Sequence, residues 1–139
     1  MHFTTLFILK NEELKDLSLS VIEDMFCERF CYCCGESKPM YVYWCDWFQI
    51  GGRWCDILVA KKGIVGERSW CNKEDTQEED HYSVVEIKDL TSPINKNQIY
   101  AVATLSRIYE DTEEKYHQYI DQINSKSFNG VIALVDCHD

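Results

Sequence analysis

Two apolar segments far apart in the sequence constrain the fold more than any other feature. Residues 3–9 and 131–135 consist mostly of apolar, β-prone side chains. They lack the alternation of polar and apolar residues that is typical of a strand with one solvent-exposed face. Such a strand must be covered on both faces, which places it inside a sheet rather than at its edge. We therefore expect these two strands to be neighbours at the centre of one sheet.

Two other segments show the three- and four-residue spacing of amphipathic helices. The first covers residues 12–29, with Asn11 as its N-cap. The second follows Asp111, which forms a capping box with Glu114, and it stops at Asn129-Gly130. The apolar positions of the first helix are Leu14, Leu17, Val21, Ile22, Met25 and Phe26, and those of the second are Tyr116, Tyr119, Ile120 and Ile123.

Shorter strands are predicted between the helices. Gly51-Gly52 is expected to supply the turn of a hairpin between strands near 40–50 and 54–61. Further strands are expected at 82–88 and 98–104, with a return through Ile108-Tyr109. This order predicts an α+β fold, a mixed and mainly antiparallel sheet with two helices. With 139 residues and no repeat or linker, the chain fits a single α+β domain over 1–139.

Composition excludes some classes of function. The net charge is −10, from 24 acidic and 14 basic residues, which opposes direct nucleic-acid binding because phosphate backbones require clustered Lys and Arg. The chain lacks the roughly 20 consecutive apolar residues that cross a bilayer. The apolar start before Lys10 is short and has no basic leader, so it is not a secretory signal. A cytoplasmic protein with no membrane association is expected.

Eight cysteines favour reduced thiols over an exported disulfide scaffold, because no secretory signal is present. Cys31 and Cys34 have the spacing of metal knuckles, but Cys45 and Cys55 are ten residues apart and supply no second tight pair. We therefore predict no metal and no cofactor. Packing as small hydrophobic residues is the preferred interpretation, and zinc is the alternative, for Cys27, Cys31, Cys33 and Cys34.

The segment from Asp46 to Trp54 concentrates unusual residue types. Adjacent glycines allow a tight turn or a close approach to a ligand. Arg53 offers a planar fork for a carboxylate or phosphate, and tryptophans offer faces for stacking. These features predict a site for a small nucleotide-like ligand, formed by Asp46, Trp47, Gly51, Gly52, Arg53 and Trp54. The structural alternative is an Arg53–Asp46 ion pair that clamps a hairpin, with the tryptophans in the core.

The ends of the two apolar strands form a second candidate site. If the strands are neighbours, His2 approaches Asp136 or His138, depending on strand direction. A histidine oriented by a carboxylate is the minimum unit for general acid–base chemistry, so these three residues are candidate catalytic residues. Two alternatives remain open: a purely structural role, and a zinc ion held by His2, Cys137 and His138.

Three segments together carry a family resemblance: His2-Phe3-Thr4, Asp46-Trp47-Phe48-x-Ile50-Gly51-Gly52-Arg53-Trp54, and Val135-Asp136-Cys137-His138. This combination resembles a largely uncharacterised family of small phage and prophage proteins. Cys45 departs from the tryptophan usual there, and Met40-Tyr41-Val42-Tyr43 stands where an Asn-Pro turn is common. The resemblance implies a phage-type accessory protein in the host cytoplasm, with counter-defence as its expected role.

Three functions are compatible with these features. The favoured one is binding of a small nucleotide-like ligand through Gly51-Gly52-Arg53-Trp54. The second is hydrolysis of a nucleotide signal by His2, Asp136 and His138. In the third, the acidic protein inhibits a basic host defence protein, through its net charge and the acidic run at 74–80.

Overall fold

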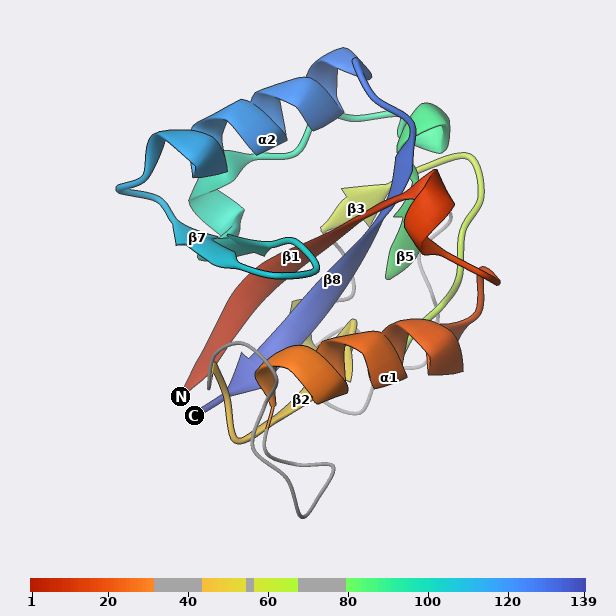
Figure 1. The fold of residues 1–139 in the computed structure, drawn as a ribbon. Helices are drawn as coiled ribbons and strands as arrows, with labels where there is room; N and C mark the ends of the chain where they lie inside the picture. The colour runs from red at the N-terminus through yellow and green to blue at the C-terminus, as the bar shows by residue number, and fades with distance from the viewer. Residues whose placement is uncertain (32–43, 55–56, 68–79) are drawn as a thin grey trace.

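The computed structural model describes residues 1–31, 44–54, 57–67 and 80–139. Its central feature is the pairing of β1 (His2–Lys10) with β8 (Gly130–His138). The two strands run antiparallel over their full length, with His2 opposite His138 and Lys10 opposite Gly130. Figure 1 shows them crossing the middle of the molecule side by side. The prediction of two central strands is therefore confirmed.

Shorter strands extend the sheet on both sides of this pair. The strand order is β2-β8-β1-β6-β7, and β5 also pairs with β8. Among the strand pairs that the structure describes, β1–β6 alone is parallel, so the mixed, mainly antiparallel α+β fold is confirmed. The return through 108–109 is confirmed as well, because β7 runs antiparallel to β6. The bounds are β2 (Trp47–Ile50), β5 (Val84–Glu86), β6 (Ala101–Ala103) and β7 (Ile108–Glu110).

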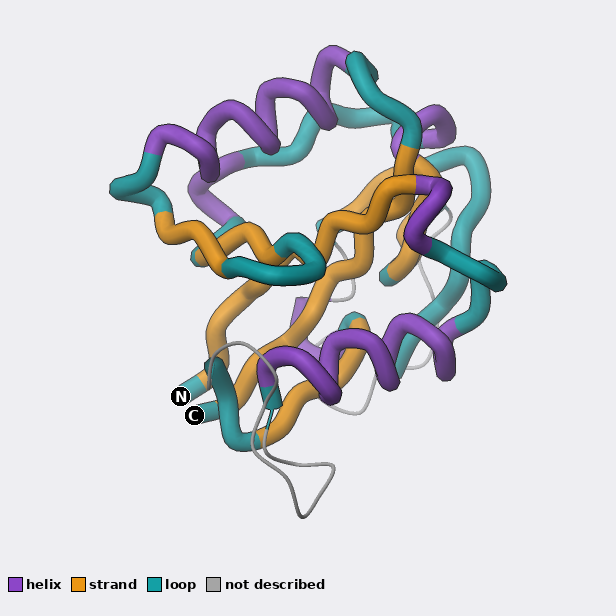
Figure 2. Tube along the Cα trace, viewed as in Figure 1, coloured by secondary structure: helices purple, strands orange, loops and turns teal. Residues whose placement is uncertain are grey.

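The two helices, α1 (Leu19–Phe30) and α2 (Glu114–Ser125), lie on opposite faces of the sheet (Figure 2). Side chains alternate along β1, so Phe7 and Leu9 join the cluster beneath α1, whereas Leu6 and Ile8 join the cluster beneath α2. All four are buried. These two strands are apolar over most of their length because each of their faces is covered by a helix.

The first helix begins later than the sequence predicts. Its N-cap is Ser18, whose Oγ accepts the Val21 N–H at 3.3 Å, and Asn11 instead opens a short 3₁₀ turn. The prediction of a helix over 12–29 with Asn11 as N-cap is therefore wrong at its start. In that turn the backbone N–H of Lys10 donates to the Glu13 carboxylate. This backbone donor therefore has a hydrogen-bond partner at the point where the chain leaves the sheet.

The second helix has the predicted apolar face: Tyr116, Ile120 and Ile123 are buried, and Tyr119 packs against the same cluster. Its predicted ends are wrong. Glu113, not Asp111, is the N-cap, because the Glu113 carboxylate turns back to accept the Glu110 N–H at 2.9 Å. The helix stops at Ser125, before Asn129-Gly130, because Lys126 adopts a left-handed conformation with φ 56°.

The predicted hairpin around Gly51-Gly52 is not formed. β2 pairs with β8, and β3 (Leu58–Val59) pairs with β4 (His81–Tyr82) in a separate two-stranded sheet. Residues 52–54 form a 3₁₀ turn between them. The 40–43 part of the predicted first strand lies outside the described residues. In the described part of the chain, no helix is long and apolar enough to cross a membrane.

Glu23 on α1 gives a pH-dependent prediction. Partial burial, followed by the nearby carboxylates of Asp24 and Glu67, raises its pKa. The folded state then binds this proton more tightly than the unfolded chain, so ionised Glu23 costs stability above its folded pKa and nothing below its unfolded pKa. We expect Glu23→Gln to raise the melting temperature at pH 7 but not at pH 3, measured by circular dichroism. Glu12→Gln, which makes the same charge change at an exposed position, is the control. An equal rise in the melting temperature of Glu23→Gln at both pH values would contradict this account.

Candidate functional site

One buried carboxylate connects three distant parts of the sequence. The Asp136 side chain, near the end of β8, has an exposed fraction of 0%. Its Oδ1 lies 2.9 Å from Nδ1 of His2, and its Oδ2 accepts the backbone N–H of Arg53 at 2.7 Å. A buried carboxylate is tolerated when its oxygens have hydrogen-bond partners, and here each oxygen has one. The start of β1, the glycine turn and the end of β8 therefore meet at this side chain.

The glycine pair makes this meeting sterically feasible. Gly51 and Gly52 have φ values of +88° and +53°, which lie in the region that favours glycine. A Cβ on Gly52 would lie 2.6 Å from Oδ2 of Asp136 and 2.7 Å from its Cβ. The backbone can pass this close only without a side chain, and the Arg53 N–H then reaches the carboxylate. The predicted close approach is real, but it serves a carboxylate of the protein itself.

The His2 imidazole is held in one orientation. The contact between Nδ1 of His2 and Oδ1 of Asp136 orients the ring. The His2 ring meets the ring of His138 edge-on, with centroids 5.0 Å apart. His138 in turn stacks on Trp47, with a centroid distance of 4.9 Å and an interplanar angle of 29°. The structure thus brings His2, Asp136 and His138 together, as expected for neighbouring strands, and adds Trp47, which was predicted for the other site.

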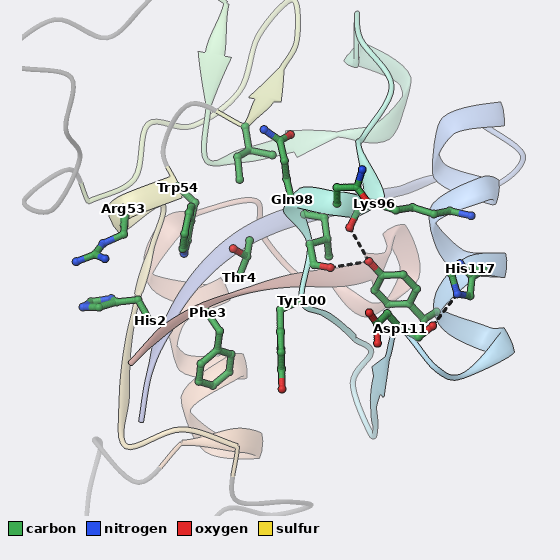
Figure 3. Close-up of a pocket in the computed structure, with 14 residues that line it drawn as sticks. His2, Phe3, Thr4, Arg53, Trp54, Lys96, Gln98, Tyr100, Asp111 and His117 are labelled. Atoms are coloured by element: carbon green, nitrogen blue, oxygen red, sulfur yellow. Dashed lines mark hydrogen bonds between the residues drawn. The ribbon is translucent and has the colours of Figure 1, made fainter.

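A groove of about 1010 Å³ opens beside this cluster on the α2 side of the sheet (Figure 3). Figure 3 shows Arg53, Trp54 and His2 gathered at one end of the groove. Lys96 and His117 lie at the other end. The middle and floor are formed by Phe3, Thr4, Gln98, Tyr100 and Asp111, among others. Of the predicted ligand-binding residues, Arg53 and Trp54 line this groove, whereas Asp46 and Trp47 do not.

The cations at the two ends of the groove differ in their partners. Nζ of Lys96 lies 3.0 Å from a carboxylate oxygen of Asp121, and Nε2 of His117 lies 2.7 Å from the backbone oxygen of Asp111. Arg53 is exposed, and its guanidinium forms no ion pair with any residue that the structure describes. The alternative of an Arg53–Asp46 clamp is therefore wrong. Arg53 is left available to an anion in the groove.

Aromatic rings line the groove next to these charges. Trp54 packs partly into the α2-side core, and its buried indole N–H has no hydrogen-bond partner among the described residues. Tyr100 is 49% exposed and contacts Phe3 with ring centroids 5.3 Å apart. Partial burial first, and then the Glu110 carboxylate, raises the pKa of Tyr100 above its ordinary value.

Sequence reasoning missed the half of the groove formed by Lys96, Gln98, Tyr100 and His117. Tyr100 lies within the predicted strand 98–104. This aromatic side chain, exposed next to a central strand, was the one available signal for this half of the groove. His117 follows the buried Tyr116 on α2, and its neighbours in sequence do not indicate a ligand. Lys96, Gln98 and Tyr100 join the site through the parallel pairing of β6 with β1, and His117 comes from α2.

The cysteines give no metal site in the part of the chain that the structure describes, where no group of three or more His, Cys, Asp or Glu could hold an ion. Cys31, Cys45 and Cys137 are buried and not disulfide-bonded, but Cys27 is disulfide-bonded, which corrects the expectation of reduced thiols throughout. Cys33 and Cys34 lie outside the described residues. Cys137 points into the α1-side cluster, away from His2 and His138, so the zinc alternative at the strand ends is wrong.

Comparisons with protein-family models, with curated proteins and with solved structures found no match. The resemblance to phage proteins therefore stays a prediction. In the fold, its three segments converge on Asp136, through His2, Arg53 and β8 itself.

Proposed function

We propose that this protein binds a small anionic ligand with a flat ring, such as a nucleotide, in the groove beside Arg53. One observation carries the proposal. In a chain of net charge −10, this groove presents an arginine that no described carboxylate neutralises, next to a tryptophan. An unpaired guanidinium in an acidic protein attracts an anion and can hold a phosphate or carboxylate through two parallel hydrogen bonds.

The remaining lining suits the rest of a nucleotide. Trp54 and Tyr100 offer ring faces on which a base can stack. The Trp54 indole N–H lacks an acceptor among the described residues, and a ligand oxygen or nitrogen would relieve that cost. Thr4 and Gln98 add neutral polar groups between the two ends of the groove. The groove thus combines aromatic ring faces with polar and charged side chains that can orient a ligand.

For a phage-type accessory protein, this binding would withdraw a nucleotide signal from a host defence protein in the cytoplasm. The competing proposal, inhibition of a basic host protein, depends on the acidic run at 74–80, which lies outside the described residues. An arginine in the groove that no described carboxylate neutralises favours the small ligand. It would serve no purpose in an interface that works by negative charge.

Binding is tested by native mass spectrometry of the protein with AMP, ATP, cyclic AMP and cyclic di-GMP. We expect a retained adduct with at least one of them, and Arg53→Ala to weaken it at least tenfold, because a charge-assisted hydrogen bond contributes about 1.5–3 kcal/mol and 1.4 kcal/mol is tenfold in affinity. Trp54→Phe keeps a stacking face and should bind better than Trp54→Ala.

The matched control is Arg107→Ala. Arg107 is also an exposed arginine, but it pairs with Glu113 at 3.0 Å and does not line the groove. Its replacement should leave the adduct unchanged. Equal weakening by Arg53→Ala and Arg107→Ala would show that the effect comes from net charge alone. Failure to detect an adduct with any of the four nucleotides would contradict the proposed ligand class.

A further inference from the structure

We infer that the groove takes a linear dinucleotide, with its 5′-phosphate at Arg53 and its unphosphorylated end at Asp111. This inference rests on the proposed ligand site and names the class of ligand that fills it. Its basis is a combination of three observations: the size of the groove, two aromatic side chains at separate positions, and opposite charges on the two sides of Tyr100.

The groove is large for a single nucleotide. Its volume of about 1010 Å³ lies at the upper limit of the range of roughly 300–1,000 Å³ that is usual for small-molecule sites. Its lining comes from the start of β1, the turn at 52–54, the 96–100 segment and α2. A mononucleotide held by Arg53 and Trp54 would occupy one end and leave the half next to Tyr100 and His117 unfilled.

The two aromatic side chains, Trp54 and Tyr100, are attached to the sheet on opposite sides of β1. The turn that carries Trp54 is held to β8, because Asp136 accepts the Arg53 N–H. Asp136 is paired with Thr4 on β1, and the Thr4 oxygen accepts the backbone N–H of Tyr100 at 2.9 Å. Neighbouring strands lie about 4.8 Å apart, so these attachment points are roughly 10 Å from each other. Since stacked bases are only about 3.4 Å apart, each ring serves a separate base (Figure 3).

The two sides of the groove also differ in charge. Arg53 lies at one end, and Asp111 lies beyond Tyr100, towards His117 (Figure 3). Nε2 of His117 contacts the backbone oxygen of Asp111, whereas the exposed Asp111 carboxylate forms no ion pair with any residue that the structure describes. This carboxylate lies close to the floor of the groove, because it adds to the effect of burial in raising the pKa of Tyr116.

The lysine at that end does not neutralise Asp111. Nζ of Lys96 lies 3.0 Å from a carboxylate oxygen of Asp121, and the Lys96 side chain extends towards α2 (Figure 3). Next to Asp111 in the sequence, the Glu110 carboxylate accepts the Tyr100 hydroxyl at 3.4 Å and adds a second negative charge. A phosphate at this end would be repelled, whereas the hydroxyl groups of a terminal ribose would donate to the Asp111 carboxylate.

Calorimetric titration with AMP and with pApA, a linear dinucleotide that carries one terminal 5′-phosphate, tests the size of the ligand. We expect pApA to bind about tenfold more tightly or better, because its second base stacks on Tyr100. Tyr100→Ala should remove most of this advantage while AMP binds as before, and Tyr100→Phe, which keeps the ring, should retain it. Tyr109→Ala is the matched control and should leave the advantage unchanged, since Tyr109 lies on β7 and does not line the groove.

A third ligand, pApAp, tests the role of Asp111. It differs from pApA only by a phosphate on the terminal 3′-oxygen. We expect it to bind the wild-type protein about fivefold more weakly or worse, because charges in a groove are screened less than in open solvent. Asp111→Asn should remove most of this difference. Glu114→Gln makes the same change of charge at an exposed position outside the groove and should preserve the difference.

The outcomes separate this inference from the proposed function. If AMP binds but pApA binds no more tightly, the groove takes a single nucleotide, and the inference is overturned while the binding function stands. If pApAp binds as tightly as pApA, Asp111 does not select the unphosphorylated end, and that assignment is wrong. If neither AMP nor pApA binds, the ligand site itself is wrong, and the inference falls with it.

Discussion

Gly52→Ala is expected to lower the free energy of unfolding by about 3 kcal/mol and to abolish ligand binding. The added Cβ would lie 2.6 Å from Oδ2 of Asp136, which is fully buried and cannot move aside. The residue also has φ +53°, a conformation that disfavours side chains. The turn must therefore retreat from Asp136, which breaks the Arg53 N–H contact and leaves a buried oxygen without a donor.

Urea denaturation followed by tryptophan fluorescence measures the stability loss, and the nucleotide adduct reports the site. Arg53→Ala is the control, since it alters the next residue in the turn but removes only an exposed side chain. That control should lose binding and keep its denaturation midpoint. A Gly52→Ala protein with the wild-type midpoint would show that the turn accommodates a side chain, contrary to the contact described here.

Phe26→Ala is expected to lower the free energy of unfolding by about 3–5 kcal/mol, the usual cost of emptying a fully buried aromatic site. Phe26 is the hub of the α1-side core, with ring centroids 5.3 Å from Phe7, 5.3 Å from Phe30 and 4.8 Å from Phe48. Because the groove lies on the opposite face of the sheet, we expect the folded fraction to bind the ligand normally. The combination of lost stability and retained binding separates this core from the site.

Thermal denaturation gives the stability, and titration of the ligand well below the new melting temperature gives the binding. Leu17→Ala serves as the control because Leu17 is 42% exposed, so its loss should cost well under 1 kcal/mol. If the two variants were equally stable, or if Phe26→Ala lost the ligand while still folded, the separation between core and groove would be wrong.

The features predictable from the sequence were those set by burial along one element. The apolar run of residues 3–9 specifies a strand covered on both faces, and the spacing of Tyr116, Ile120 and Ile123 specifies one buried helix face. The proximity of His2 to Asp136 follows from the same reasoning, once the strands are antiparallel neighbours. These inferences need only local periodicity and the requirement that apolar surface be covered.

The features that sequence reasoning missed depend on contacts between distant residues. Gly51-Gly52 has the composition of a hairpin turn, but its conformation is determined by the contact with Asp136, which is more than 80 residues away in the sequence. Asn11 and Ser18 are both acceptable N-caps, and the choice is decided by where the chain leaves β1. Lys96 and Tyr100 reach the groove only because β6 runs parallel to β1, which no local pattern encodes.

The pairing of β1 with β8 also has a consequence for biosynthesis. A ribosome releases β1 long before β8, its partner strand on one side. Until then β1 presents an apolar strand edge, the kind of surface that chaperones and aggregation both recognise. His2 and Asp136 are separated by 134 positions, so the site does not exist on any shorter nascent chain. Acquisition of the site therefore waits for β8, and a chain that is terminated before β8 lacks it.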